Sequence, residues 1–149
     1  MALIDLVSED IVKVPLSAST KDEVIHELIA VLKAAGKIRD TGKVYEAILA
    51  REGLGSTGLE KGIAVPHAKT DQVEKLTLAI GISPNGVDFA AMDGQPSKLF
   101  FMMLAAPDQS GPHIEALAEI ARITRSDAFC RVLASAVSAK EIVELFTEE

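Results

Sequence analysis

Short apolar runs and helical stripes alternate along this 149-residue chain, and together they predict its elements in order. The first run, residues 11–16, predicts a strand that ends at a polar cluster. Beyond it, Thr20 and Glu23 form a capping-box pattern, and apolar residues recur at helical spacing as far as Gly36. The beginning of the chain is therefore predicted to be a strand followed by a long helix.

A second helix is predicted over residues 41–52, where Val44, Ala47, Ile48 and Arg51 share one stripe. This stripe places Arg51 at the end of a buried face. An arginine in that position can lie along the core with its head in water, meet a structural carboxylate or bind an anion. The pattern by itself leaves these interpretations open.

Three further apolar runs predict three strands, at residues 63–65, 76–82 and 99–104. The tripeptide at 84–86, Pro-Asn-Gly, predicts a turn after the second of these strands, and Asp-Gly at 93–94 predicts a turn before the third. The third run reads L-F-F-M-M-L and shows no alternation, which is typical of a strand buried on both faces.

The remaining residues predict three helices. Pro112 is expected at the first position of the first helix, and its inner stripe is predicted to be Ile114, Leu117, Ala118 and Ala121. The second helix is predicted over residues 127–137 and the third over 140–146, with Ser138 as its cap. The order β-α-α-β-β-β-α-α-α implies an α/β domain with helices on both sides of a central sheet.

The stretch from Arg51 to Asp71 reads R-E-G-L-G-S-T-G-L-E-K-G-I-A-V-P-H-A-K-T-D and carries the most distinctive chemistry of the chain. Its four closely spaced glycines, with Ser56 and Thr57 between them, form a loop that can turn N–H groups toward an anion. Pro66 keeps the residue before it extended and cannot donate to a sheet ladder, so His67 is expected where a strand ends. These features predict a site that handles phosphate.

His113 is predicted in the first turn of its helix, either as a simple helix-start residue or as a donor to an anion. His26 lies on the polar side of its helix and is predicted to be solvated. A metal hydrolase that uses His67 and His113 with Asp71 or Asp108 is an alternative from another class. The chain has three histidines and no paired-ligand spacing such as H-x-x-x-H, which disfavours that alternative.

Composition limits the remaining classes. The net charge of −7 argues against binding to nucleic acid, whose phosphates need a Lys/Arg surface. No apolar run approaches the roughly 18 residues that a membrane span needs, and no signal peptide is expected. Cys130 is the single cysteine and is predicted to be a small buried residue. It has no intrachain disulfide partner, so a cytoplasmic location is expected.

The block REGLGSTGLEKGIAVPH resembles the signature of enzyme IIA domains from the fructose/mannitol/nitrogen-regulatory branch of the bacterial phosphotransferase system. The resemblance continues through VDFAAMDGQPSKLFFMMLAAP to GPHIEALAEIA, so it covers nearly the whole chain. It implies a single three-layer α/β/α domain with a mixed sheet over residues 1–149. We expect neither a cofactor nor a metal.

In that family the histidine that closes the motif accepts a phosphoryl group from a small histidine phosphocarrier protein and passes it to a IIB domain. The resemblance therefore implies that His67 is the acceptor and that Arg51 and His113 assist transfer. The loop N–H groups and hydroxyls are expected to share the remaining phosphate charge, at Ser56, Thr57 and Gly58. The group that holds the other nitrogen of His67 is not evident. Any association with a membrane IIC permease would run through IIB.

His67 must meet the nucleophile of another protein, so we expect it in a shallow depression that a partner can reach. The residues near it in sequence predict an apolar rim, from Leu54, Leu59, Ile63 and Ala68, and surface charges, from Glu52, Glu60, Lys61 and Lys69.

Two roles are compatible with the resemblance. One is sugar transport, with a fructose-type sugar favoured by the segments PHAKTD and DGQPSKLFF. The other is that of the nitrogen-regulatory members, which carry phosphate as a signal and bind regulatory targets without transporting sugar. A neighbouring gene for a fructose-type IIB/IIC permease would discriminate between these two roles.

Overall fold

The computed structural model describes residues 3–148 of the chain. The elements, in chain order, are two 3-10 helices, η1 (Leu3–Leu6) and η2 (Glu9–Ile11), then β1 (Val12–Lys13), α1 (Lys21–Ala34), α2 (Thr41–Glu52), β2 (Ile63–Ala64), β3 (His67–Lys69), β4 (Thr77–Val87), β5 (Ser97–Ala105), α3 (Ser110–Ile123), α4 (Asp127–Ser135) and α5 (Ala139–Glu148). Among the described residues, none of these helices is both long enough and apolar enough to cross a membrane.

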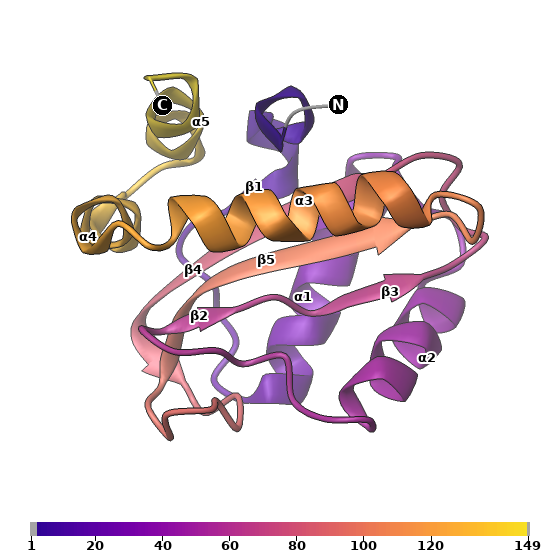
Figure 1. Cartoon of the computed structure of the whole chain (residues 1–149), viewed down its shortest axis with the longest axis horizontal. Coiled ribbons are helices and arrows are strands. Elements are labelled where there is room, and N and C mark those ends of the chain that lie inside the picture. Colours follow the sequence, from indigo (N-terminus) through magenta and orange to yellow (C-terminus); the bar gives the residue numbers. More distant parts are fainter. Residues whose placement is uncertain (1–2, 149) are drawn as a thin grey trace.

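The five strands form one mixed sheet with β5 near its centre (Figure 1). On one side β5 pairs antiparallel with β4, which in turn pairs parallel with β1. On the other side the short strands β2 and β3 follow each other along β5, both parallel to it. All of β5 except Lys98 is buried, so the prediction of a strand buried on both faces is confirmed.

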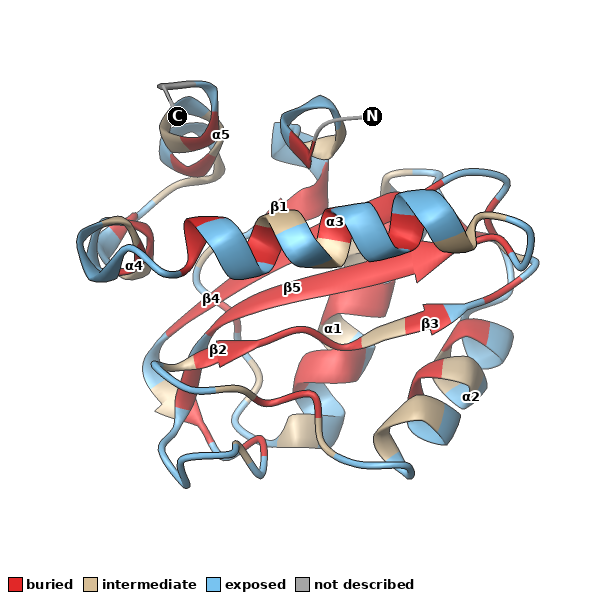
Figure 2. Cartoon of the chain, in the orientation of Figure 1, coloured by how far each residue is buried: buried red, intermediate tan, exposed pale blue. Residues whose placement is uncertain are grey.

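Helices cover both faces of this sheet. Helix α3 crosses one face above β5, and α1 lies on the opposite face (Figure 1). Helix α2 packs beside α1 and β3, while α4 contacts β4 and β5 and α5 contacts β1. Figure 2 shows the buried residues concentrated in the strands and on the inner sides of the helices. The predicted three-layer α/β/α architecture with a mixed sheet is confirmed.

The helix starts follow the local chemistry of the sequence. The capping box before α1 is formed as predicted, with the Thr20 side chain accepting from the N–H of Glu23 and the Glu23 side chain accepting in return. Asp40 caps α2 by accepting from the N–H of Lys43. Ser138 accepts from the N–H of Glu141 and so caps α5.

Two strand predictions were clearly wrong in their bounds, and a further strand, β3, was not predicted, so four strands instead of three lie between α2 and α3. β1 covers two residues instead of 11–16, because Pro15 cannot donate to the ladder and interrupts it; Leu16 still donates to the Ile82 carbonyl over 2.8 Å. The turn predicted at 84–86 lies inside β4, where the register shifts between Ile82 and Val87. The polar tripeptide therefore forms an irregularity within the strand, while the chain reverses over residues 88–96.

The predicted inner stripe of α3 was also wrong. The buried residues of this helix are His113, Ala116, Ile120 and Ile123, and Ile114 is 67% exposed. The helix begins at Ser110, so Pro112 is its third residue, where its missing N–H is still harmless. Apolar residues occupy much of the circumference of this helix, so its period alone did not identify the buried face.

Helix α4 ends at Ser135, two residues before the predicted end. Two predictions outside the main stripes are confirmed. His26 is exposed and stacks on Tyr45, and Cys130 is buried.

Candidate functional site

His67 begins the second of the two short strands that pair with the outer side of β5. Pro66 separates β2 from β3, and its carbonyl accepts from the N–H of Met103 over 2.9 Å. His67 is the first residue of β3 and stands opposite Met103. The expectation that it sits where a strand ends was therefore wrong in detail, because the chain resumes pairing at once beyond Pro66. The side chain is half-buried at the edge of the sheet.

A backbone carbonyl fixes the tautomer of His67. The Nδ1 atom lies 2.7 Å from the carbonyl oxygen of Val65. A carbonyl oxygen only accepts, so Nδ1 carries the proton and Nε2 keeps its lone pair. A neutral imidazole with a free Nε2 is a competent nucleophile at physiological pH. Sequence reasoning did not identify this acceptor, since a main-chain carbonyl leaves no trace in the choice of side chain.

His113 meets His67 edge to face. The two ring centroids are 5.4 Å apart and the ring planes make an angle of 76°. His113 is only 6% exposed, and its Nε2 is buried with no hydrogen-bond partner among residues 3–148. Burial is the main cause that lowers the pKa of His113, and the charges of His67 and Lys69 lower it further. The ring is therefore neutral at physiological pH.

Arg51 lies in the last turn of α2, beside a hollow of about 190 Å³ next to His67. Its Nη1 donates to the carbonyl of Gly55 over 2.8 Å, which fixes the guanidinium and leaves its other N–H donors for an anion. The lining of this hollow combines two candidate site residues with hydroxyl-bearing and apolar residues: Arg51, Ser56, Thr57, Leu59, Val65, His67, Leu117, Ile120 and Ala121.

The loop hydroxyls line the hollow, but their protons are already engaged. Ser56 donates to the Phe89 carbonyl over 2.6 Å, and Thr57 donates to the Glu52 carboxylate. The N–H of Gly58 donates to Ser56 Oγ over 3.0 Å. A phosphoryl group could accept from these three residues only if the bonds within the loop exchanged. Phosphate contact at Ser56, Thr57 and Gly58 therefore stays a prediction.

Glu52 is a part of this site that sequence reasoning placed on the surface. Its side chain is only 5% exposed, and it pairs with the ammonium group of Lys21 over 2.8 Å. One feature of the sequence indicated that Glu52 belongs to the site, because Glu52 directly follows Arg51 and precedes the glycine loop. Its partner, Lys21, lies at the start of α1, about thirty residues earlier. The spacing of apolar residues within each helix could not predict that these two charged side chains pair.

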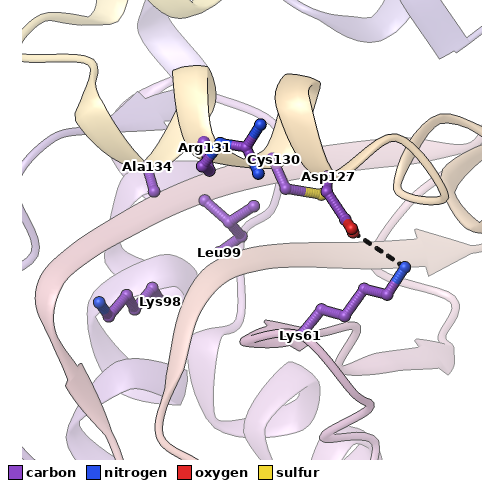
Figure 3. Close-up of a pocket in the computed structure, with 7 residues that line it drawn as sticks. All are labelled: Lys61, Lys98, Leu99, Asp127, Cys130, Arg131 and Ala134. Carbon is purple, nitrogen blue, oxygen red and sulfur yellow. Dashed lines mark ion pairs between the residues drawn. The ribbon is translucent and has the colours of Figure 1, made fainter.

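Two other kinds of site were considered, a metal site and an anion site in a second hollow. Within residues 3–148, no three His, Cys, Asp or Glu side chains gather to hold a metal ion. A larger hollow of about 290 Å³ lies between the end of the glycine loop, β5 and α4 (Figure 3). There Lys61 pairs with Asp127 over 3.0 Å, and the ammonium group of Lys98 points away from that pair. The hydrogen bond and the charge of Lys61, and more weakly the charge of Arg131, lower the pKa of Asp127, so this carboxylate compensates the cations that line the hollow.

Comparison with known proteins places this geometry in a family. A model of the "Phosphoenolpyruvate-dependent sugar phosphotransferase system, EIIA 2" family matches residues 5–149. The fructose-specific EIIABC component of Bacillus subtilis (strain 168) is 36% identical over 99% of this chain, which spans 23% of that relative. The fructose-specific EIIA component of Haloferax volcanii is 35% identical over 87% of this chain and 84% of its own length.

Regulatory relatives are equally similar. The nitrogen regulatory protein of Escherichia coli (strain K12) is 35% identical over 82% of this chain and 76% of its own length. The crystal structure of the nitrogen regulatory protein IIA-Ntr from Neisseria meningitidis matches with a TM-score of 0.89 and 27% identity, over 97% of this chain and 98% of that one. The chain therefore belongs to the EIIA type 2 family of the phosphoenolpyruvate-dependent sugar phosphotransferase system, a family of phosphotransfer domains.

Proposed function

We propose that this protein accepts a phosphoryl group from a histidine phosphocarrier protein on Nε2 of His67 and passes it to a IIB domain. The observation that carries the proposal is the 2.7 Å contact between Nδ1 of His67 and the Val65 carbonyl. It lies beside Arg51 and beside His113, whose buried Nε2 has no hydrogen-bond partner in residues 3–148. In the transfer step, the Nε2 lone pair of His67 forms a bond to phosphorus. The bond between phosphorus and the donor's imidazole breaks, and its electron pair returns to that ring.

Three groups stabilise the transfer. The guanidinium of Arg51 neutralises charge on the equatorial phosphoryl oxygens, which is the main demand of phosphoryl transfer. The Nε2 of His113 donates a hydrogen bond to one of these oxygens, which gives this buried atom a partner. The Val65 carbonyl keeps accepting from Nδ1 and so stabilises the positive charge that develops on the ring of His67.

The partner surface surrounds the hollow at His67. Leu54 of the glycine loop is 86% exposed, and Ile114, next to His113 on α3, is 67% exposed. These two residues supply apolar rim, whereas Ile63 and Ala68, which sequence reasoning also assigned to it, are buried. Donor and acceptor must both reach His67, so we propose that they use overlapping surfaces. A mannitol IIA protein of the same fold from Escherichia coli is known in complex with a phosphorylated IIB.

We propose a fructose-type sugar system as the setting, in a reducing cytoplasm. The fructose-specific relatives support this choice. The second candidate is regulation without sugar transport, which the nitrogen regulatory relatives and the Neisseria meningitidis structure favour. A gene for a fructose-type IIB/IIC permease beside the gene for this protein would favour the first candidate, and its absence would favour the second.

The test is phosphorylation with purified components. Phosphoenolpyruvate, enzyme I and the phosphocarrier protein should add one acid-labile phosphate to each chain, and none to a folded His67→Ala variant. His26→Ala is the matched control, since His26 is exposed and stacks on Tyr45 away from the hollow, and its labelling should equal that of the unmodified protein. Undiminished labelling of His67→Ala would refute the proposal.

A further inference from the structure

We propose that Glu52 is a positioning residue, which holds the tautomer and orientation of His67 through a chain of hydrogen bonds that crosses the glycine loop. The chain runs from Glu52 to Thr57, from Thr57 to Val65 and from Val65 to His67. The consequence for transfer rests on the proposed function, whereas the consequence for the His67 ring does not.

The first link is a buried carboxylate with all of its contacts in the loop and α1. Glu52 Oε1 accepts from the backbone N–H of Thr57 over 3.1 Å, and Oε2 accepts from the Thr57 hydroxyl. The ammonium group of Lys21 lies 2.8 Å from Oε1. A buried carboxylate must be paired and hydrogen-bonded, because an unpaired charge in the interior is strongly unfavourable. The two bonds to Glu52 hold Thr57, which is only 3% exposed, in one position, and Lys21 compensates the charge of Glu52.

The second and third links use the main chain. The carbonyl of Thr57 accepts from the N–H of Val65 over 3.1 Å, and the carbonyl of Val65 accepts from Nδ1 of His67 over 2.7 Å. The residues next to this path are paired as well, since Gly58 and Ala64 form an antiparallel bridge. A displacement of Thr57 therefore moves the carbonyl that determines which nitrogen of His67 carries the proton.

Lys21 also connects the glycine loop to the segment that contains Phe89. Its ammonium group lies 4.7 Å from the centre of the Phe89 ring and 3.5 Å from Ser56 Oγ. Ser56 in turn donates to the Phe89 carbonyl. The charge of Lys21 thus compensates the buried Glu52 while its side chain joins α1, the glycine loop and the segment that contains Phe89. Two members of this network, Lys21 and Phe89, lie far from the phosphotransfer motif in sequence.

Glu52→Gln tests the proposal, because glutamine keeps the shape of the side chain. Its amide oxygen can still accept from the N–H of Thr57. Its NH2 group cannot accept the Thr57 hydroxyl proton, and the ion pair with Lys21 is lost. The tautomer of His67 in the unphosphorylated protein is read from its ring ¹⁵N shifts. We expect the proton to be confined to Nδ1 in the unmodified protein and shared between the two nitrogens in Glu52→Gln.

Phosphoryl transfer supplies the second readout. We expect Glu52→Gln to transfer roughly ten- to a hundredfold more slowly, as a small misplacement of the reacting atom commonly does. Glu27→Gln is the matched control. Glu27 is also a carboxylate that holds a loop, with bonds from the N–H groups of Ser17 and Ala18. No path of hydrogen bonds through the described part of the chain links it to His67 in the way that Glu52 is linked. It should lower stability without changing the tautomer or the rate.

Thr57→Val and Thr57→Ser keep the test decisive if Glu52→Gln does not fold. Valine removes the hydroxyl and should reproduce the mixed tautomer, whereas serine keeps the hydroxyl and should restore the unmodified pattern. A folded Glu52→Gln variant with an unchanged tautomer would overturn the inference, whatever its rate. Failure of the proposed function would look different, since the tautomer would change as expected in a protein that takes no phosphate on His67.

Discussion

Among the candidate site residues, His113 has the environment that most clearly predicts a hydrogen bond to a bound phosphoryl group. Its Nε2 is buried and has no hydrogen-bond partner among the described residues, and its ring contacts that of His67. We expect His113→Ala to accept phosphate still, because the nucleophile is intact, but to transfer it about a hundred- to a thousandfold more slowly in both directions. Loss of one donor to a developing charge commonly has this effect. Rapid-quench kinetics measure both directions, and normal rates in both would remove His113 from the site.

The lowered pKa of His113 also predicts how stability depends on pH. Burial, with the charges of His67 and Lys69, keeps the folded-state pKa below the unfolded value of about 6.5. As the pH falls below about 6.5, the unfolded chain binds this proton first. The stability that His113 contributes is therefore fully present above that pH and is lost as the pH falls through the lowered pKa.

His113→Gln should consequently be less sensitive to acid than the unmodified protein. Denaturant unfolding at pH 7.5 and pH 5 measures the difference, and an equal loss of stability in both proteins would contradict the prediction.

At this scale the sequence predicted which side chains lie together in the candidate site, whereas their roles stay predictions. Arg51 and His67 line one hollow as expected, and His113 contacts His67 from the first turn of α3. The Val65 carbonyl could not be predicted, because every residue has a carbonyl and only the fold selects one. Glu52 was assigned to the surface, because its compensating charge on Lys21 is distant in sequence and pairing across elements leaves no local pattern.

The glycine loop is the element in which local geometry most constrains the sequence. A Cβ atom on Gly58 would lie 2.9 Å from Ala91 Cα and 3.0 Å from the Phe89 carbonyl oxygen. Both are backbone atoms, so the loop itself would have to move. We expect Gly58→Ala to destabilise the protein by roughly 1–3 kcal/mol, as overpacking usually does, and to slow transfer because the shift reaches Thr57.

Denaturant unfolding checks the Gly58 prediction against Gly111→Ala. At Gly111 an added Cβ meets no atom within 4 Å, so that variant should be close to neutral in both stability and transfer. Equal stabilities of the two variants would show that the loop accommodates the methyl group.

The types of the elements were predictable from the sequence, whereas several of their bounds were not. The burial of β5 and the caps of α1 and α5 depend on neighbouring residues in the sequence, and the predictions of this strand and of these caps are confirmed. The tripeptide at 84–86 has the composition of a turn, but the strand pairs with β5 on both sides of it, at Ile82 and at Val87, and this pairing keeps the tripeptide within β4. In α3 the orientation is set by packing against β5, which turns His113 inward and Ile114 outward.

For the whole molecule, the exposed apolar residues near the hollow predict a shared docking surface. We expect Ile114→Asp to weaken binding of both the phosphocarrier protein and the IIB domain by roughly tenfold or more, because central apolar contacts dominate such interfaces. Val137→Asp is the control, since Val137 is 75% exposed but lies between α4 and α5, far from β3 (Figure 1). Chemical-shift mapping with each partner measures both effects. Disjoint footprints, or footprints that leave out His67, would contradict a shared surface.

The most direct test of the whole account is the position of the phosphorus atom in the phosphorylated protein. Nδ1 of His67 is held by the Val65 carbonyl, so the phosphoryl group must bond to Nε2. Protein with ¹⁵N-labelled histidine, charged by phosphoenolpyruvate, enzyme I and the phosphocarrier protein, should show phosphorus–nitrogen coupling at Nε2 of His67 alone. Coupling at Nδ1 of His67, or at His26 or His113, would contradict the account.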